Sequence, residues 1–231
     1  MGVNTGNSAM RSSFFYGGYY KTVAKQLKEY INSAPDFLSA QTARSTRAAG
    51  DAIENLISEK FDTFLGDWCK EYSSSFARRA MADVAFKDKE DFYCVVDVKT
   101  HREDTKFNMP NLTSVERLSR FYEDNTNIFA LIMVKYSLEG NRVIATEVNF
   151  VPIEFLNWDC LTVGALGWGQ IQIANSNNIV LRDGYSRKKW MLTLCETMLE
   201  FYPKEILKIH TRIGRFEQVK SYWENKEDIW I

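Results

Sequence analysis

The chain has 231 residues, of which 45% are hydrophobic and 26% are charged, and its formal net charge is −1. This composition fits one folded globular domain and excludes intrinsically disordered, collagen-like and small disulfide-stapled proteins. Only two histidines, His101 and His210, are present, so zinc sites and catalytic centres that need several imidazoles are almost excluded.

In chain order, the expected elements are a helix over residues 20–31, a helix after Gly50, strands over 81–86 and 92–98, a helix from Ser114 to about residue 124, strands over 128–136 and 142–150, short strands over 170–173 and 179–181, and helices over 187–201 and from 204 to about 223. The four strands from 81 to 150 form two hairpins. This order predicts an α/β or α+β fold with a mixed central β-sheet flanked by helices, in a single domain over residues 1–231.

The cysteines and the hydropathy indicate where the protein is found. The four cysteines lie far apart among apolar neighbours, so we expect reduced and mostly buried thiols. No stretch approaches the roughly 18 apolar residues of a membrane span, and the first residues contain no hydrophobic signal core. We therefore expect a cytoplasmic protein that does not bind membranes. The net charge neither requires nor excludes a nucleic-acid partner.

Two aspartates lie near the ends of the first predicted hairpin. Asp97 and Lys99 are two positions apart in a strand, so they project from one face while Val98 points into the core. Antiparallel pairing can bring Asp83 alongside Asp97. Two converging carboxylates suit a hard divalent cation such as Mg²⁺, and a neighbouring ammonium group can position a water and oppose charge on phosphorus. The pattern therefore favours a metal-dependent phosphodiesterase.

The triplet Asp97-Val98-Lys99 indicates little by itself, because surface strands routinely carry acid and lysine pairs. Its context carries the interpretation: a hydrophobic strand precedes it, Asp83 lies on the paired strand, and an upstream helix contains Glu54. An ordinary exposed helix glutamate remains the alternative for Glu54. Asp51 is a weaker candidate, since the helix dipole alone explains an acid in a first turn.

Asp83 followed by Asp97-Val98-Lys99 resembles the motif of the PD-(D/E)xK nucleases, although Ala82 stands where that superfamily usually has proline. More closely, the chain resembles its type II restriction endonucleases of the HincII-like and EcoRV-like blunt-cutting group. The similar segments are residues 48–56, 92–100, 110–114, 170–172 and 187–190. The resemblance covers about residues 48–190, and the first forty and last thirty residues have no counterpart.

The resemblance implies a restriction-endonuclease-like core over about residues 48–190, followed by a helical C-terminal part. It implies Asp83, Asp97 and the Val98 carbonyl as ligands of Mg²⁺, for which Mn²⁺ can substitute, and Lys99 as the group that orients the water. Glu54 becomes an accessory catalytic acid. The implied enzyme is a type II site-specific deoxyribonuclease that hydrolyses double-stranded DNA at a palindromic site and leaves blunt ends with 5′-phosphates.

A cutter of palindromic DNA needs one active site for each strand, so we expect a homodimer. Candidate DNA contacts lie in the loop 101–113 after the catalytic strand, in the glycine-rich stretch 164–170 and the polar residues that follow, and among basic residues at helix starts. They are Arg44, Arg47, His101, Arg102, Asn108, Asn111, Ser114, Gly167, Trp168, Gly169, Gln170, Gln172, Asn175, Asn177, Arg187, Lys188 and Lys189. Amide side chains can read base edges, and basic side chains can bind phosphates.

Each of these contacts has a structural alternative: asparagines that only form turns, a tight bulge beside a buried tryptophan, and solvated helix charges. Two other functions also fit the same core. One is a repair or recombination nuclease that recognises DNA structure, and the other is a catalytically inactive DNA-binding protein. A restriction role further implies a companion DNA methyltransferase that forms no stable complex with this protein.

Overall fold

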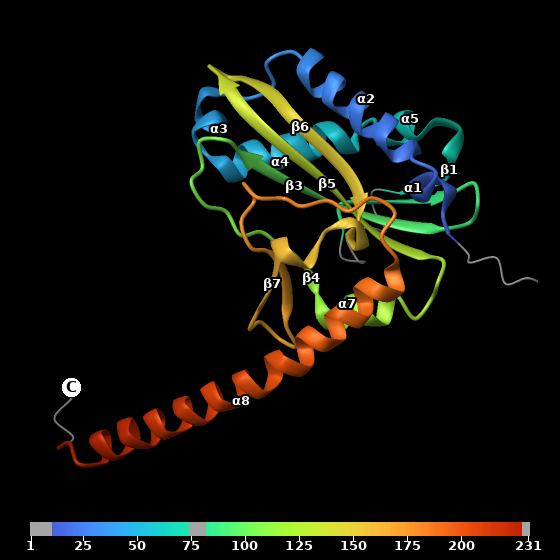
Figure 1. Ribbon diagram of the computed structural model, residues 1–231. Helices are drawn as coiled ribbons and strands as arrows, with labels where there is room; N and C mark the ends of the chain where they lie inside the picture. The colour runs from blue at the N-terminus through green and yellow to red at the C-terminus, as the bar shows by residue number, and fades with distance from the viewer. Residues whose placement is uncertain (1–10, 74–81, 228–231) are drawn as a thin grey trace, which may run out of the picture. The chain divides into compact units, whose positions relative to one another are not determined.

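The computed structural model describes residues 11–73 and 82–227, and the chain divides into two compact units, Met1–Tyr185 and Ser186–Ile231. The first unit contains a five-stranded mixed sheet in the order β1–β2–β3–β5–β6 (Figure 1). Its strands are β1 (Cys69–Ser73), β2 (Val84–Asp88), β3 (Tyr93–Arg102), β5 (Asn127–Glu139) and β6 (Arg142–Pro152). Because β3 and β5 run parallel while the other neighbours are antiparallel, the predicted mixed sheet is confirmed.

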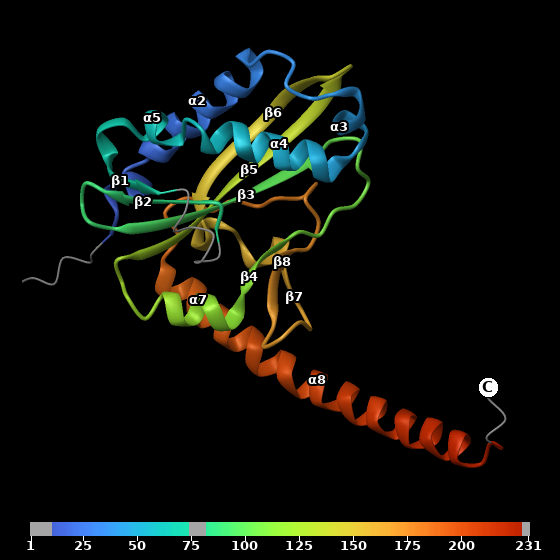
Figure 2. The ribbon, with the colours of Figure 1, turned by 180° about the vertical axis from the view of Figure 1, so that it is seen from behind.

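Helices cover one face of this sheet. They are α1 (Ser13–Tyr16), α2 (Tyr19–Ser33), α3 (Ala40–Arg44), α4 (Thr46–Ser58) and α5 (Phe61–Leu65). Helix α2 packs against β6 and α4 packs against β3, and the two helices also contact each other (Figure 2). The predicted stripe of Val23, Leu27 and Ile31 on α2 is fully buried against the sheet side of the unit. The sheet is therefore flanked by helices, as expected.

Aromatic side chains form the centre of the core between these helices and the sheet. The ring of Phe14 packs against Phe86 and Phe150, with ring centroids 5.7 Å apart in both pairs, and Phe61 packs against Phe150 at 5.5 Å. All four side chains are buried. Burying a phenylalanine side chain contributes about 1.5–3 kcal/mol, so this cluster holds the helical layer firmly on the sheet that carries Asp97.

A second, three-stranded sheet has the order β4–β8–β7, with β4 (Asn111–Ser114), β7 (Leu161–Gly164) and β8 (Gln170–Ile173). Helix α7 (Val115–Phe121) follows β4, and the short 3-10 helices are η1 (Gly66–Trp68), η2 (Ile153–Phe155) and η3 (Trp158–Cys160). Of these three strands the sequence predicted only β8. The loop expected over residues 101–113 is shorter than predicted, because β3 continues through Arg102 and β4 begins at Asn111.

Three further expectations about the first unit need correction. Helix α4 begins at Thr46 rather than after Gly50, because the Ser45 hydroxyl accepts a hydrogen bond from the Ala48 N–H and caps it there. The predicted strand 179–181 is reduced to a single bridge between Leu181 and Leu156. The predicted strand 81–86 begins at Val84, and residue 81 lies outside the described residues.

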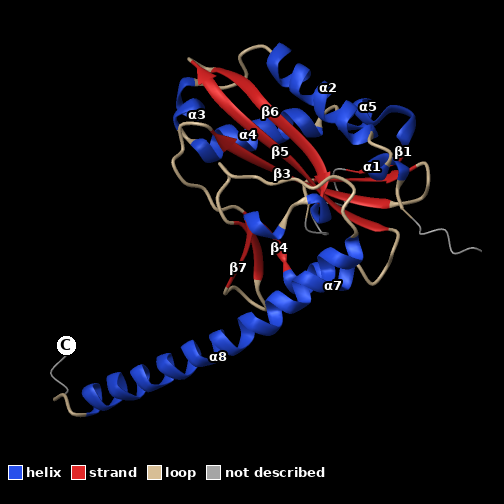
Figure 3. Cartoon of the chain, viewed as in Figure 1, coloured by secondary structure: helices blue, strands red, loops and turns tan. Residues whose placement is uncertain are grey.

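The second unit consists mainly of α8 (Arg187–Glu224), a helix of 38 residues that Figure 3 shows without interruption. We predicted two helices separated near Pro203. We expected a break because a proline inside a helix removes one intrahelical hydrogen bond. That prediction was wrong, since α8 continues through Pro203. The Ser186 hydroxyl caps the start of α8 by accepting from the Lys189 N–H at 3.5 Å.

Within the described residues, no helix combines the length and the apolar character that crossing a membrane requires. None of the four cysteines, all of which lie in the described residues, forms a disulfide. Cys94 and Cys160 are buried, whereas Cys69 is partly exposed and Cys195 is exposed, so the expectation of mostly buried thiols holds for only two of them.

Candidate active site

The hairpin of β2 and β3 places Asp83 beside Asp97. Val84 pairs with Val96, and the Asp83 N–H donates to the Val96 carbonyl at 3.0 Å, so the antiparallel pairing continues one residue beyond β2. Continuing this register sets Asp83 opposite Asp97. The Asp83 carboxylate also accepts a hydrogen bond from the Val98 N–H at 2.6 Å. The structure therefore brings together the two aspartates that the sequence singled out.

Asp97 is a buried carboxylate with one ammonium neighbour. Its side chain is adjacent to that of Lys99, whose Nζ donates to Oδ1 at 2.9 Å and lies 2.8 Å from Oδ2. Oδ2 is buried and accepts no hydrogen bond of good geometry from the part of the chain that the structure describes. Burial raises the pKa of Asp97 to about 7, although the charge of Lys99 opposes the rise. Asp97 therefore has less positive charge around it than its ionised form needs.

Glu54 joins the aspartates because α4 lies very close to β3. A Cβ atom added to Gly50 would lie 2.6 Å from the Thr100 Oγ1, so only glycine permits this approach without a shift of the neighbouring side chain. Glu54 follows about one helical turn later. Burial first, and then the charge of Asp83 and a hydrogen bond with its carboxyl group, raise the pKa of Glu54 to about 7.

A hollow of about 500 Å³ opens beside these groups. Glu54 and Lys99 line this hollow. Three predicted DNA contacts also line it, namely Arg47, Arg102 and Asn108. Further lining residues that the sequence analysis did not single out are Thr46, Thr105, Phe107 and Tyr136. The Tyr136 hydroxyl is buried and has no hydrogen-bond partner among residues 11–73 and 82–227. The sequence signal for Tyr136 as a site residue was its position, a phenol near the end of a strand of otherwise buried apolar residues.

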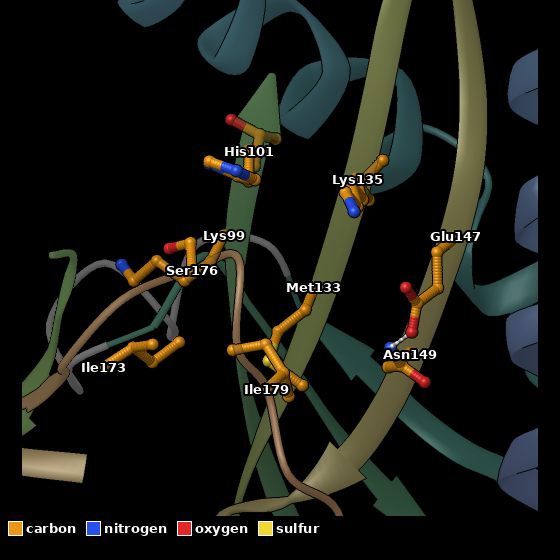
Figure 4. A pocket seen from close by; sticks show the side chains of 11 residues that line it. Lys99, His101, Met133, Lys135, Glu147, Asn149, Ile173, Ser176 and Ile179 are labelled. Carbon is orange, nitrogen blue, oxygen red and sulfur yellow. Dashed lines mark hydrogen bonds between the residues drawn. The ribbon is translucent and has the colours of Figure 1, made fainter. Parts of the chain in front are cut away.

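Lys99 and His101 also line a smaller cavity of about 40 Å³, shown in Figure 4, where β5 contributes Met133 and Lys135 and β6 contributes Glu147 and Asn149. His101 is only 6% exposed. Its Nε2 lies 2.8 Å from the Asn177 Oδ1. The structure therefore places His101 inside the protein, which favours a supporting role over the predicted contact with DNA.

The turn that contains Asn175 and Asn177 is tied to the segment after β3. The Asn177 amide group donates to the carbonyls of Thr105 and Lys106 at 3.3 and 3.1 Å. The side-chain oxygen of Asn175 accepts a hydrogen bond from the Asn177 backbone N–H at 3.0 Å. These bonds engage much of the polar capacity of both asparagines in holding the loop.

The three-stranded sheet gathers several predicted DNA contacts. Asn111 pairs with Gln172 and Ser114 pairs with Gln170 in the β4–β8 register. The Gln172 amide donates to the Asn111 side-chain oxygen at 2.6 Å. Segments that are separated by about sixty residues thus present neighbouring amide groups, and both side chains are at least partly exposed. Neighbouring amides of this kind can read the edges of bases.

The glycine-rich stretch forms the connection between β7 and β8. Gly167 and Gly169 have φ angles of 59° and 123°, a region that favours glycine. Trp168 between them is 56% exposed, so the alternative of a bulge beside a buried tryptophan is wrong. The Arg120 guanidinium lies 5.9 Å from the centre of the Trp168 ring. An exposed aromatic next to an arginine suits contact with a polyanion that also carries stacking surfaces.

The remaining predicted contacts are basic residues near helix ends. Arg44 is the last residue of α3, and Arg47 lies in the first turn of α4. Arg102 donates to the Asp104 carboxylate at 2.6 Å and to the Ala43 carbonyl at 3.2 Å, so it links β3 to α3. Arg187, Lys188 and Lys189 form the first turn of α8 in the second unit.

The chain was also compared with known proteins. No protein-family model matches it, and no curated protein matches it. Among residues 11–73 and 82–227, no group of three or more histidine, cysteine, aspartate or glutamate side chains is arranged to hold a metal ion. The geometry and electrostatics of four residues therefore point to the function: Glu54, Asp83, Asp97 and Lys99.

Proposed function

We propose that this protein is a magnesium-dependent endonuclease with a PD-(D/E)xK core, which cleaves double-stranded DNA at a palindromic site as type II restriction endonucleases do. One observation carries the proposal. The β2–β3 pairing sets Asp83 opposite Asp97, Lys99 contacts Asp97, and the charge of Asp83 contributes to the raised pKa of Glu54. A buried aspartate that has two partly exposed carboxyl groups and a single lysine beside it is expensive in a purely structural role, whereas it suits a site that binds a cation.

The residues present fit a magnesium ion. Asp97 Oδ2 is a buried oxygen that accepts no hydrogen bond of good geometry from the described residues, although the Lys99 Nζ lies 2.8 Å from it, and the pKa values of Asp97 and Glu54 are raised to about 7. Mg²⁺ takes only one or two protein carboxylates and completes its shell with water and substrate phosphate oxygens. Asp83, Asp97 and the Val98 carbonyl therefore suffice as ligands without a third acid. Bound there, Mg²⁺ or Mn²⁺ would polarise the phosphate and make a water molecule more acidic.

The side chains around this position have complementary roles. Lys99, whose side chain is 25% exposed, reaches the hollow and can donate to the attacking water and to the developing charge on phosphorus. Glu54 has a pKa of about 7, so it can exchange a proton with solvent at neutral pH. Asp83 holds the Val98 backbone through its hydrogen bond to the Val98 N–H.

The neighbouring surfaces support DNA as the substrate. Arg47 in the hollow can bind a phosphate beside the scissile bond, and Asn108 lies in the same hollow. The neighbouring amides of Asn111 and Gln172 on the small sheet support this choice, because amide groups can address base edges. The proposal includes a homodimer, blunt ends with 5′-phosphates, a cytoplasmic location and a companion methyltransferase that protects host DNA.

The test is digestion of a sequenced supercoiled plasmid with the full chain in Mg²⁺, Mn²⁺ or EDTA. We expect discrete, reproducible fragments in either metal, none in EDTA, and ends that ligate without repair. Lys99→Ala should lower the cleavage rate at least about a hundredfold and leave DNA binding intact. Lys135→Ala is the matched control, because Lys135 lies on the adjacent strand and contacts Glu103 rather than Asp97.

Four outcomes contradict the proposal. Absence of cleavage in both metals with retained binding would indicate the inactive DNA-binding protein. A smear, or cleavage only at junctions, would indicate a structure-specific nuclease. Absence of binding would exclude DNA as substrate. Unchanged cleavage by Lys99→Ala would remove Lys99 from the mechanism.

A further inference from the structure

Seven of the exposed apolar residues of α8 recur at alternating intervals of three and four, while Leu207 and Tyr222 are exposed outside this series. The seven are Leu199, Tyr202, Ile206, Ile209, Ile213, Phe216 and Trp223, and Lys220 occupies the remaining position of the series. We call these eight residues the α8 stripe. Leu192 and Cys195, which are also exposed, continue the same intervals toward the start of the helix. The series from 192 to 223 is longer than four heptads.

This repeat differs from that of a helix packed on a globular core. A core-facing helix follows a period of about 3.6 residues, whereas a strict period of 3.5 over at least three or four heptads is typical of a coiled coil. The apolar residues of the stripe are all exposed, from Tyr202 at 39% to Leu199 at 74%. Seven large apolar side chains on one narrow line of a helix form an apolar surface of the kind that marks an interaction site.

The charges beside the stripe identify the partner. Arg212 flanks the stripe on one side, and Glu217, five residues later, flanks it on the other. In a parallel pair of identical helices, these two positions meet across the interface. Each Arg212 then faces Glu217 of the partner subunit, and the symmetry makes this ion pair twice. In an antiparallel pair centred on the stripe, Arg212 would instead approach the partner's Arg212.

We propose that α8 forms a parallel two-stranded coiled coil with α8 of a second copy of this chain, through the α8 stripe. Arg212 and Glu217 are both exposed, and no ion pair within the described part of the chain involves either of them. Lys220 lies at a core position, where a single lysine fixes the register of a coiled coil at some cost in stability. A palindrome cutter needs two copies but not this helix, so the pairing stands or falls independently of cleavage.

The main test measures association of the full chain by sedimentation velocity over a dilution series, without DNA or metal. Ile206→Glu and Leu207→Glu form a matched pair, because the two residues are neighbours, are 54% and 68% exposed, and only Ile206 belongs to the stripe. We expect a wild-type dimer. Ile206→Glu should raise the dimer dissociation constant at least about a hundredfold, since it introduces two facing charges. Leu207→Glu should change it by less than about threefold.

A monomeric wild type, a trimer or larger assembly, or equal effects of the two substitutions would overturn the proposal. Circular dichroism of each variant shows whether it keeps the wild-type helix content, and both substitutions replace exposed side chains, so the fold should be retained. Because the assay contains no DNA, its failure leaves the proposed nuclease activity untouched, and absence of cleavage leaves this proposal untouched.

Orientation is tested by cross-linking. In a Cys195→Ser background, Phe216→Cys should give a disulfide-linked dimer on mild oxidation, because parallel helices bring the two introduced thiols together. In the antiparallel arrangement residue 216 faces residue 206, and the thiols would be separated by about 15 Å along the axis. Arg212→Glu should weaken the dimer, and adding Glu217→Arg should restore it. Failure of both the cross-link and the rescue would refute the parallel arrangement.

Discussion

Replacing Asp97 with asparagine should stabilise the metal-free protein at neutral pH while abolishing cleavage. Asp97 is only 7% exposed, and burial raises its pKa from 3.8 to about 7. Between these two values the folded protein binds a proton that the unfolded chain does not bind. The free energy of unfolding therefore falls as the pH rises through this window, by about 1.4 kcal/mol for each pH unit. Below the window both forms are protonated, and above it both are ionised.

The expected size follows from that slope. From pH 5 to pH 8, Asp97 should lower the free energy of unfolding of the wild-type protein by about 2–3 kcal/mol. An asparagine side chain cannot ionise, so the Asp97→Asn variant should lack this loss. Glu54, whose pKa is also about 7, remains in both proteins and adds a smaller common slope because it is partly exposed. Mg²⁺ should stabilise the wild type at pH 8 and should have much less effect on Asp97→Asn.

The measurement is urea unfolding followed by tryptophan fluorescence in EDTA, at several pH values between 5 and 8. Asp36→Asn is the control, because Asp36 is an exposed aspartate away from the site and its replacement should leave the slope unchanged. Equal pH slopes for wild type and Asp97→Asn would refute the reasoning. A variant that is several kcal/mol less stable at pH 8 would also refute it, because the ion pair with Lys99 would then outweigh the penalty of burial.

Three further predictions follow from the site. Glu54→Gln should lower the cleavage rate at least about tenfold and flatten the pH–rate profile near pH 7, and an unchanged profile would assign the titration to another group. In urea unfolding, Gly50→Ala should stabilise the Thr100→Ala variant by about 1 kcal/mol, because the Oγ1 atom is gone, but should not stabilise the wild type. If the effects of the two substitutions on the free energy of unfolding were additive, the close approach of α4 to β3 would be contradicted. The logarithm of the DNA-binding constant falls with the logarithm of the salt concentration, and Arg47→Ala should make this slope shallower by about one. An unchanged slope would place Arg47 away from the phosphates.

The sequence could predict the hairpin of the candidate site because both of its strands are continuous apolar runs joined by a short charged turn. The placement of Asp83 opposite Asp97 follows from that local pairing alone. The small sheet could not be predicted in the same way. Its strands have only four residues, and Asn111 pairs with Gln172, sixty-one positions away. Neither β4 nor β8 has an apolar pattern strong enough to predict that such distant segments pair.

Glycine and proline had the opposite consequences from those expected of them. Gly50 indicated the start of a helix, yet it lies within α4, where its missing side chain admits Thr100 of β3. Pro203 indicated the end of a helix, yet α8 continues through it. Both residues have strong local preferences, but tertiary packing and long flanking helical segments override them.

The position of Glu54 shows how a non-local contact completes a locally built site. The aspartates reach each other through hairpin pairing, whereas Glu54 reaches them only because α4 lies against β3 at Gly50. Burial and the charge of Asp83 raise the pKa of Glu54 to about 7, so above that pH and without a metal ion these two acids are both ionised and repel each other. The packing of α4 therefore holds together groups that electrostatics would separate. A cation bound by Asp83 and Asp97 would remove this conflict, which is why stability and metal binding should be coupled most strongly above pH 7.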